Sequence, residues 1–192
     1  MPIFIFNKLK GMADRIFEKI KQELKKGAFK KGHYFKYFTL ATLGVDKYAR
    51  LRLVALRNVS EDLKLTFFTD KRSKKVLHIK ENNKVSLLFY HHKKLVQLRI
   101  EGLAKINNDQ FEIKKNWAEV GAESKKDYLT KKAPGTSIKS PENLEYLKEG
   151  DFFSIVEIEP FRIEYLKLKK NGHSKIKFDK TDKGWSSEYL VP

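Results

Sequence analysis

The stretch of residues 51–104 decides the predicted fold, and it reads LRLVALRNVSEDLKLTFFTDKRSKKVLHIKENNKVSLLFYHHKKLVQLRIEGLA. Apolar residues alternate with polar ones along much of it, as a period of two residues requires of strands with one buried face. Only the short run around Val76, Leu77 and Ile79 has helical spacing. The stretch therefore predicts several antiparallel strands with one short helix between them.

A basic turn connects the second of these strands to the helix. It runs from Thr69 to Lys75 with the sequence TDKRSKK, and Ser73 is expected to be the helix N-cap. Cations at the start of a helix oppose its dipole, and a bound anion removes that cost. The hydroxyls of Thr69 and Ser73 and the lysine side chains are suitable donors to a phosphate. The alternative interpretation is a solvated turn in a chain that is rich in lysine throughout.

Four segments taken together resemble the FMN-binding split barrels related to pyridoxamine 5'-phosphate oxidase. They are RLVALR (52–57), FFTDKRSKK (67–75), NNKVSLLF (82–89) and QLRIEG (97–102). The resemblance implies a mainly β fold with helices (α+β), namely a six-stranded antiparallel split barrel flanked by helices, as one domain over residues 1–192. It also implies FMN as cofactor and a homodimer with FMN at the subunit interface. The pattern is most similar to a branch of flavin-binding relatives whose reactions are mostly unassigned.

The resemblance assigns a flavin site residue by residue. The FMN phosphate is expected to meet Arg52, Lys74 and Lys75, together with the hydroxyls of Thr69 and Ser73. The rest of the implied flavin pocket comprises the strand backbone at Leu53, Val54 and Leu56, then Phe68, Arg57 near the ring and substrate, Gln97, and Lys175 from the second subunit.

The implied activity is that of a flavin-dependent oxidoreductase with an unassigned substrate. In the family, a Tyr and two Arg residues help to bind the substrate phosphate, but the corresponding positions here fall near Asn116, Val120 and Asn171. Ser124 and His173 remain, and His173 is the only candidate catalytic residue, with an exposed turn histidine as the alternative. A flavin-binding protein without turnover is the other interpretation of the same resemblance.

The composition suggests one rival function and argues against several others. A net charge of +17 could attract nucleic acid, but the lysines are scattered through every segment and no nucleic-acid-binding motif is present. The chain has no cysteine and its five histidines lack metal-ligand spacing, so no metal site is expected. No apolar run approaches the length of a membrane span, and the protein is expected to be cytoplasmic and not membrane-bound.

The remaining segments are expected to flank the barrel. An amphipathic helix over Gly11–Lys26 should end at Gly27. Gly102 suits a bulge or a close backbone approach, and the His91-His92 pair should form a solvated turn. The other predicted elements are a strand over 34–43, helices near 107–117, near 123–129 and from Ser140, two strands (152–158 and 161–168) separated by Glu159-Pro160, a strand over 175–178 and a closing strand over 184–192.

Overall fold

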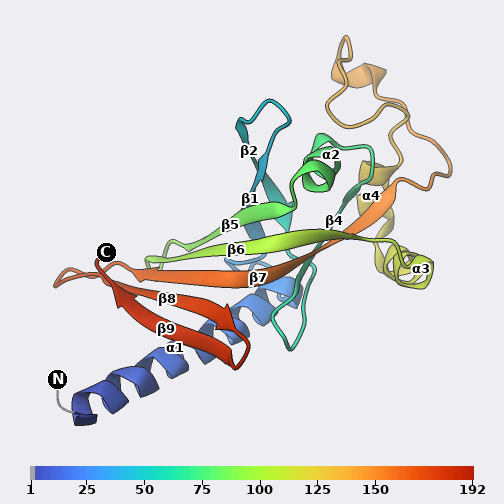
Figure 1. Ribbon diagram of the computed structural model, residues 1–192. Coiled ribbons are helices and arrows are strands. Elements are labelled where there is room, and N and C mark those ends of the chain that lie inside the picture. Colours follow the sequence, from blue (N-terminus) through green and yellow to red (C-terminus); the bar gives the residue numbers. More distant parts are fainter. Residues whose placement is uncertain (1–2) are drawn as a thin grey trace.

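The computed structural model describes residues 3–192, with side chains from residue 11 onward, and Figure 1 shows a curled antiparallel sheet flanked by helices. The helices are α1 (Ile3–Phe29), α2 (Lys74–Glu81), α3 (Gln110–Glu119), α4 (Ala122–Lys125) and two short 3₁₀ turns, η1 (Lys126–Tyr128) and η2 (Pro141–Asn143). The strands are β1 (Tyr37–Leu43), β2 (Ala49–Ala55), β3 (Asn58–Val59), β4 (Leu65–Asp70), β5 (Lys84–His91), β6 (Val96–Asn107), β7 (Phe153–Lys167), β8 (Ser174–Thr181) and β9 (Gly184–Leu190).

The sheet has the strand order β2-β1-β5-β6-β7-β4-β3, and β8 and β9 extend it from β7. All of these pairs are antiparallel, so the predicted mainly β class with flanking helices is confirmed. The described residues form nine strands where six were expected, partly because β3 is a two-residue strand and the hairpin of β8 and β9 adds two strands beside β7. The assignment of all 192 residues to one domain stays a prediction.

The inner face of the sheet forms the hydrophobic core. The register aligns one row of buried residues across the strands, and because direct partners share a face, this row runs through the centre of the barrel. The row comprises Leu40, Leu87, Ile100, Ile163 and Phe178.

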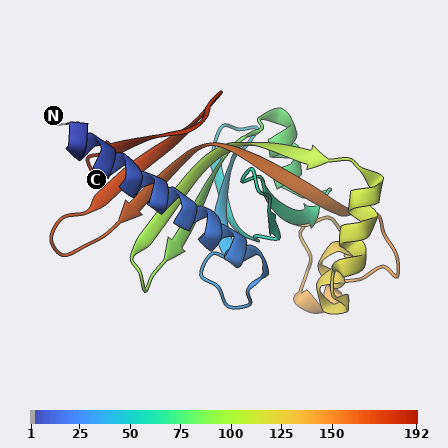
Figure 2. The ribbon, with the colours of Figure 1, turned by 90° about the horizontal axis from the view of Figure 1, so that it is seen from below.

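Helix α1 lies along the core side of the curved sheet, as the view from below in Figure 2 shows. Phe17 packs against Phe178 and Trp185 with ring centroids 5.0 and 5.3 Å apart. The expected end of the helix at Gly27 was wrong, because α1 continues to Phe29. Gly27 instead permits a close approach, since a Cβ there would lie 2.7 Å from the carbonyl oxygen of Phe35.

Two other local predictions were wrong. The segments 152–158 and 161–168 form one continuous strand, β7, because a bulge opposite Gly102 lets the chain pass through Pro160 without a break. The helix expected from Ser140 is only the 3₁₀ turn η2. The expectation for Gly102 was correct, since a Cβ there would lie 2.7 Å from the carbonyl oxygen of Glu159.

The His91-His92 pair is not a simple solvated turn. His91 is buried at the end of β5 and stacks on Tyr34 with the ring centroids 4.0 Å apart, while His92 is exposed. Burial lowers the pKa of His91 below its usual value, because the charged form loses hydration.

Candidate functional site

Arg52 on β2 and Lys75 on α2 form a pair of half-buried cations beside β1, the strand against which α2 packs. Neither has an ion pair with a carboxylate among the described residues. Burial lowers the pKa of Lys75, and the nearby charge of Arg52 lowers it further, while Asp70 acts in the opposite direction. Burial also lowers the pKa of Arg52. The two cations lose part of their hydration and repel each other, and both effects are unfavourable. A bound anion would offset them and stabilise the site.

Backbone and hydroxyl groups hold Arg52 in position. Its Nη1 donates to the carbonyl oxygen of Leu40 at 3.3 Å and to Thr42 Oγ1 at 2.7 Å. Its Nε and Nη2 have no hydrogen bond among the described residues, so these donors are available to a ligand. A phosphate therefore fits this site, because it could accept from the remaining Arg52 and Lys75 donors.

His78 supports Arg52 through Thr42. His78 Nδ1 lies 3.0 Å from Thr42 Oγ1, and both side chains are buried. Because Thr42 already accepts from Arg52, its hydroxyl hydrogen can donate to His78 Nδ1 only if that nitrogen is unprotonated. Burial and the charges of Arg52 and Arg50 lower the pKa of His78, which favours this neutral form. The sequence offered no signal for Thr42 or His78, because neither belongs to a recognisable motif.

The basic turn before α2 contributes hydroxyls to the same place. Thr69 and Ser73 are buried, with their hydroxyl oxygens 3.2 Å apart, and Lys75 Nζ donates to Thr69 Oγ1 at 2.9 Å. Ser73 occupies the N-cap position as expected, but its side chain makes no capping hydrogen bond. Lys74 is exposed at the first position of α2. The structure thus places Arg52, Thr69, Ser73 and Lys75 together, with Lys74 at the margin.

Arg72 fixes the basic turn to a distant loop. Its guanidinium forms an ion pair with buried Asp70 at 2.6 Å and lies 3.4 Å from the ring centroid of Phe152. It also donates to the carbonyl oxygens of Thr130 and Lys131, at 2.8 and 3.3 Å. The pairing with Asp70 raises the pKa of Arg72. Arg72 is therefore a structural clamp and contributes no free charge to an anion.

Arg57, Phe68 and Tyr128 form a second group beyond the end of β2. The Arg57 guanidinium lies 5.5 Å from the ring centroid of Phe68. Burial raises the pKa of the Tyr128 hydroxyl, and the charge of Arg57 and a hydrogen bond with it act in the opposite direction. Tyr128 was not identified from the sequence, because it lies in the short 3₁₀ turn η1 after α4 and belongs to no recognisable motif. This group presents a cation, a hydroxyl and an aromatic face.

The side chains of β2 divide between the two faces of the sheet. Val54 and Leu56 belong to the core, whereas Leu53 is 72% exposed on the outer face. Neither core side chain is therefore available to a ligand. The backbone of Leu56 is also occupied, because its N–H donates to the carbonyl oxygen of Lys36 and its carbonyl oxygen accepts from Lys36 Nζ. The same alternation directs the backbone of Val54 toward Phe38 of β1. β2 is the last strand on its side of the sheet path, so its outer edge has backbone groups that pair with no strand among residues 3–192.

Gln97 and Lys175 lie on the outer face, away from Arg52. Gln97 pairs with Leu166, and Leu166 pairs with Lys175, so these residues share one row of the sheet. Arg52 belongs to the opposite, inner face, in the row of Leu40. One chain therefore does not bring Gln97 and Lys175 together with the cation pair.

The outer face beside Gln97 is apolar over β1, β2 and β5. The pairing register makes its exposed large side chains neighbours, and exposed apolar patches on a protein commonly mark an interface. These side chains are Tyr37, Leu51, Leu53, Leu88 and Tyr90.

His173 lies in the exposed turn between β7 and β8, where its Nδ1 accepts from the backbone nitrogen of Lys169 at 3.3 Å. It is not part of the Arg52 group in the single chain. Its catalytic role stays a prediction.

Within the described part of the chain, no group of three or more His, Cys, Asp or Glu residues could hold a metal ion. Over the same residues, no helix is both long enough and apolar enough to span a membrane.

Comparison with known proteins identifies relatives of both the sequence and the fold. Residues 14–108 match the family described as pyridoxamine 5'-phosphate oxidase, FMN-binding domain. The pyridoxine/pyridoxamine 5'-phosphate oxidase of Psychrobacter cryohalolentis is 30% identical over 170 residues, which cover 80% of this chain and 78% of the relative. The enzyme of the same name from Zymomonas mobilis is 26% identical over 165 residues, covering 80% and 85%.

Two solved structures are similar over nearly their whole length. A pyridoxamine 5'-phosphate oxidase-related, FMN-binding protein from Nostoc punctiforme aligns with a TM-score of 0.74 and 21% identity, covering 91% of this chain and 96% of the other. PhzG from Burkholderia lata, solved in complex with tetrahydrophenazine-1-carboxylic acid, aligns with a TM-score of 0.71 and 19% identity, covering 95% and 91%. At these identities the two structures establish the fold.

Proposed function

Because the chain belongs to the pyridoxamine 5'-phosphate oxidase-like family of FMN-binding split barrels, we propose that it is an FMN-dependent oxidoreductase that works as a homodimer. FMN is its cofactor. The observation that carries the proposal is the half-buried pair of Arg52 and Lys75, which has no carboxylate partner among the described residues. These two cations bind the FMN phosphate, with the hydroxyls of Thr69 and Ser73 beside them and Lys74 at the margin.

The division of the site between two faces of the sheet supports the homodimer. Gln97 and Lys175 lie on the face opposite Arg52, so in our proposal they contact the flavin held by the other subunit. The exposed apolar side chains of β1, β2 and β5 then form the contact between the subunits. A second copy buries this patch and completes both flavin sites at once.

The bound flavin supplies the redox chemistry, which is the transfer of electron pairs at its ring system. The protein positions the substrate beside that ring. Arg57 attracts and orients an anionic group of the substrate, the Tyr128 hydroxyl forms a hydrogen bond, and Phe68 offers an apolar surface. The unpaired backbone edge of β2 around Leu53 lies along the flavin.

We further propose that the substrate is not pyridoxamine 5'-phosphate. Asn116 donates to the carbonyl oxygen of Glu112 in its own helix at 2.8 Å, and Val120 packs in the small apolar cluster around Phe153. Neither residue therefore supplies a cation to the phosphate of such a substrate. A substrate with one anionic group near Arg57 matches these side chains better.

The test begins with the visible absorption spectrum of the purified protein, followed by chromatographic identification of the released chromophore. We expect FMN at about one per chain, as a single family site per subunit requires, a dimer in size-exclusion chromatography, and reoxidation of the reduced flavin by oxygen or another acceptor. A colourless protein that also fails to bind added FMN would refute the cofactor site. Bound FMN that no acceptor reoxidises after reduction would refute the oxidoreductase activity but not the binding site.

A further inference from the structure

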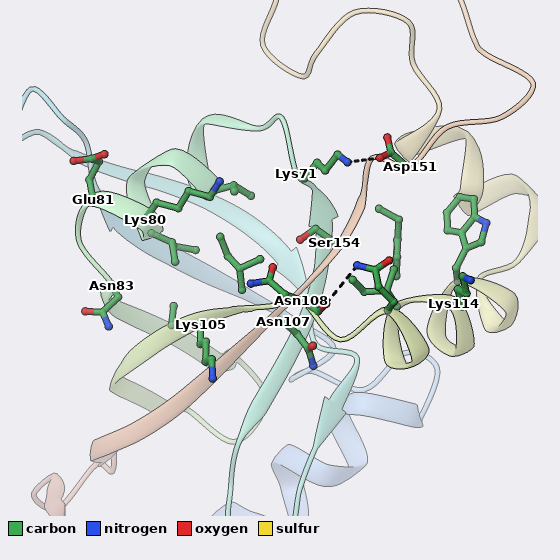
Figure 3. Close-up of a pocket in the computed structure, with 18 of the residues that line it drawn as sticks. Lys71, Lys80, Glu81, Asn83, Lys105, Asn107, Asn108, Lys114, Asp151 and Ser154 are labelled. Carbon is green, nitrogen blue, oxygen red and sulfur yellow. Dashed lines mark hydrogen bonds and ion pairs between the residues drawn. The ribbon is translucent and has the colours of Figure 1, made fainter.

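A second cleft lies on the other side of α2 from the Arg52–Lys75 pair. It is bordered by α2, the C-terminal half of β6, α3 and the start of β7, and has a volume of about 920 Å³ (Figure 3). Lys75 and His78 face the cation site described above, whereas Val76, Ile79 and Lys80 of the same helix line this cleft. The cleft is therefore separate from the proposed FMN phosphate site.

Lysines surround the cleft and most of them are unpaired. Lys71 forms an ion pair with Asp151 at 2.6 Å. Lys80, Lys105 and Lys114, which Figure 3 shows on different sides of the cleft, have no ion pair or hydrogen bond from the ammonium group among the described residues. The lining thus contains four lysines but only two carboxylates, those of Glu81 and Asp151. The resulting positive potential favours an anionic ligand.

The interior of the cleft combines an apolar surface with available polar groups. Ile106, Ile113 and Trp117 provide partly buried apolar walls. Ser154 is only 4% exposed, yet its hydroxyl has no hydrogen bond among the described residues, and it lines the cleft. The side-chain amide of Asn108 at the rim is also without a partner in the described part of the chain. Because no buried side-chain oxygen or nitrogen of the described residues lacks a hydrogen-bond partner, the Ser154 hydroxyl has to open onto the cleft, where a ligand can reach it.

We propose that this cleft is a second ligand site, which binds a small anion with an aromatic or apolar body of about the size of a nucleotide. The volume lies within the range of about 300–1,000 Å³ that is usual for small-molecule pockets. The unpaired lysines bind the anionic group, the apolar walls contact the body, and Ser154 and Asn108 bind its polar atoms. The site operates independently of the flavin, whose phosphate is held on the other side of α2.

The test is isothermal titration calorimetry on the full-length, FMN-loaded protein with two probes, ATP without divalent cations and 1-anilinonaphthalene-8-sulfonate. We expect at least one probe to bind saturably. It should also bind more tightly than tripolyphosphate, which has the negative charge without a ring system, and than adenosine, which has the ring system without the charge. Replacing Lys80→Gln and Lys105→Gln together should weaken that binding by about tenfold or more, since each loses a charge-assisted contact.

The matched control carries Lys31→Gln and Lys183→Gln, two exposed lysines outside the cleft lining, so that the total charge changes equally. The control should retain affinity within about twofold of the wild type, given the weak effect of screened surface charges. Three results would overturn the proposal: no saturable binding of either probe, equal weakening in the control, or binding that is unaffected by the cleft substitutions but lost on Lys75→Met.

Discussion

Replacing Lys75 by methionine should have opposite effects on FMN binding and on the stability of the FMN-free protein. Lys75 Nζ donates one hydrogen bond to Thr69 Oγ1 at 2.9 Å and has two further donors for the phosphate. Methionine has a similar length and fills the same space without the charge. The change therefore removes the ammonium group and leaves the packing of α2 largely intact.

The magnitude follows from the lost contact. A hydrogen bond to a charged partner contributes about 1.5–3 kcal/mol, so the dissociation constant for FMN should rise by a factor of roughly 10 to 150. In the FMN-free protein, the same substitution should be favourable, and the quantity it changes is the folding stability. Burial and Arg52 lower the pKa of Lys75, which means that the charged form is disfavoured in the folded state. Removing it should stabilise the FMN-free protein by on the order of 1 kcal/mol, or about 2–4 °C in melting temperature.

Two measurements on the same variant check this prediction. A fluorescence titration of FMN gives the dissociation constant, and a thermal melt without FMN gives the stability. Lys80→Met is the matched control, because Lys80 is on the same helix but lines the other cleft. An FMN affinity within about twofold of wild type in the Lys75→Met variant would refute the assignment of Lys75 to the phosphate.

Further predictions concern the supports of the site. Thr42→Val removes the hydroxyl between Arg52 and His78 and should weaken FMN binding by about fivefold to tenfold in the same titration, while normal affinity would mean that Arg52 needs no such support. Arg72→Met leaves the buried Asp70 carboxylate unpaired and should reduce the free energy of unfolding by about 3 kcal/mol in urea melts, with partial recovery when Asp70→Asn is added. Leu53→Glu places a charge in the exposed apolar patch and should yield monomers with little FMN in size-exclusion chromatography, whereas an FMN-loaded dimer would contradict the proposed interface. The pKa of His78 is lowered in the folded protein, so neutral His78 stabilises the fold fully above about pH 6.5, and this contribution is lost as the pH falls from there toward the folded-state pKa. Thermal melts from about pH 7 to pH 5 should therefore show a loss of stability that the His78→Gln variant reduces.

Some of the site could be predicted because it depends on local sequence. The basic turn from Thr69 to Lys75 sits between a strand and a helix, and short segments of this kind retain their shape in the fold. The grouping of Thr69, Ser73 and Lys75 in the structure agrees with that expectation. The partners Thr42 and His78 were missed, because they meet the turn only when β1 packs against α2.

The ends of several elements were mispredicted where a tertiary contact overrides the local signal. Gly27 is a common helix terminator, but here the close approach of Phe35 requires a residue without a side chain inside the helix. Pro160 usually interrupts a strand, but the bulge opposite Gly102 accommodates it. His91 was expected in solvent, yet Tyr34 covers it.

The sequence alone determined the family and the cofactor, because the resemblance rests on short motifs together with the period-two alternation of β2, β4, β5 and β6. The phosphate-binding residues stay a prediction. Only the tertiary structure decided which of the predicted residues could act together. The side chains of a strand alternate between two faces, and the pairing register alone decides which residues of distant strands share one face. That register separates Gln97 and Lys175 from Arg52, and in our proposal the second subunit brings them to one flavin.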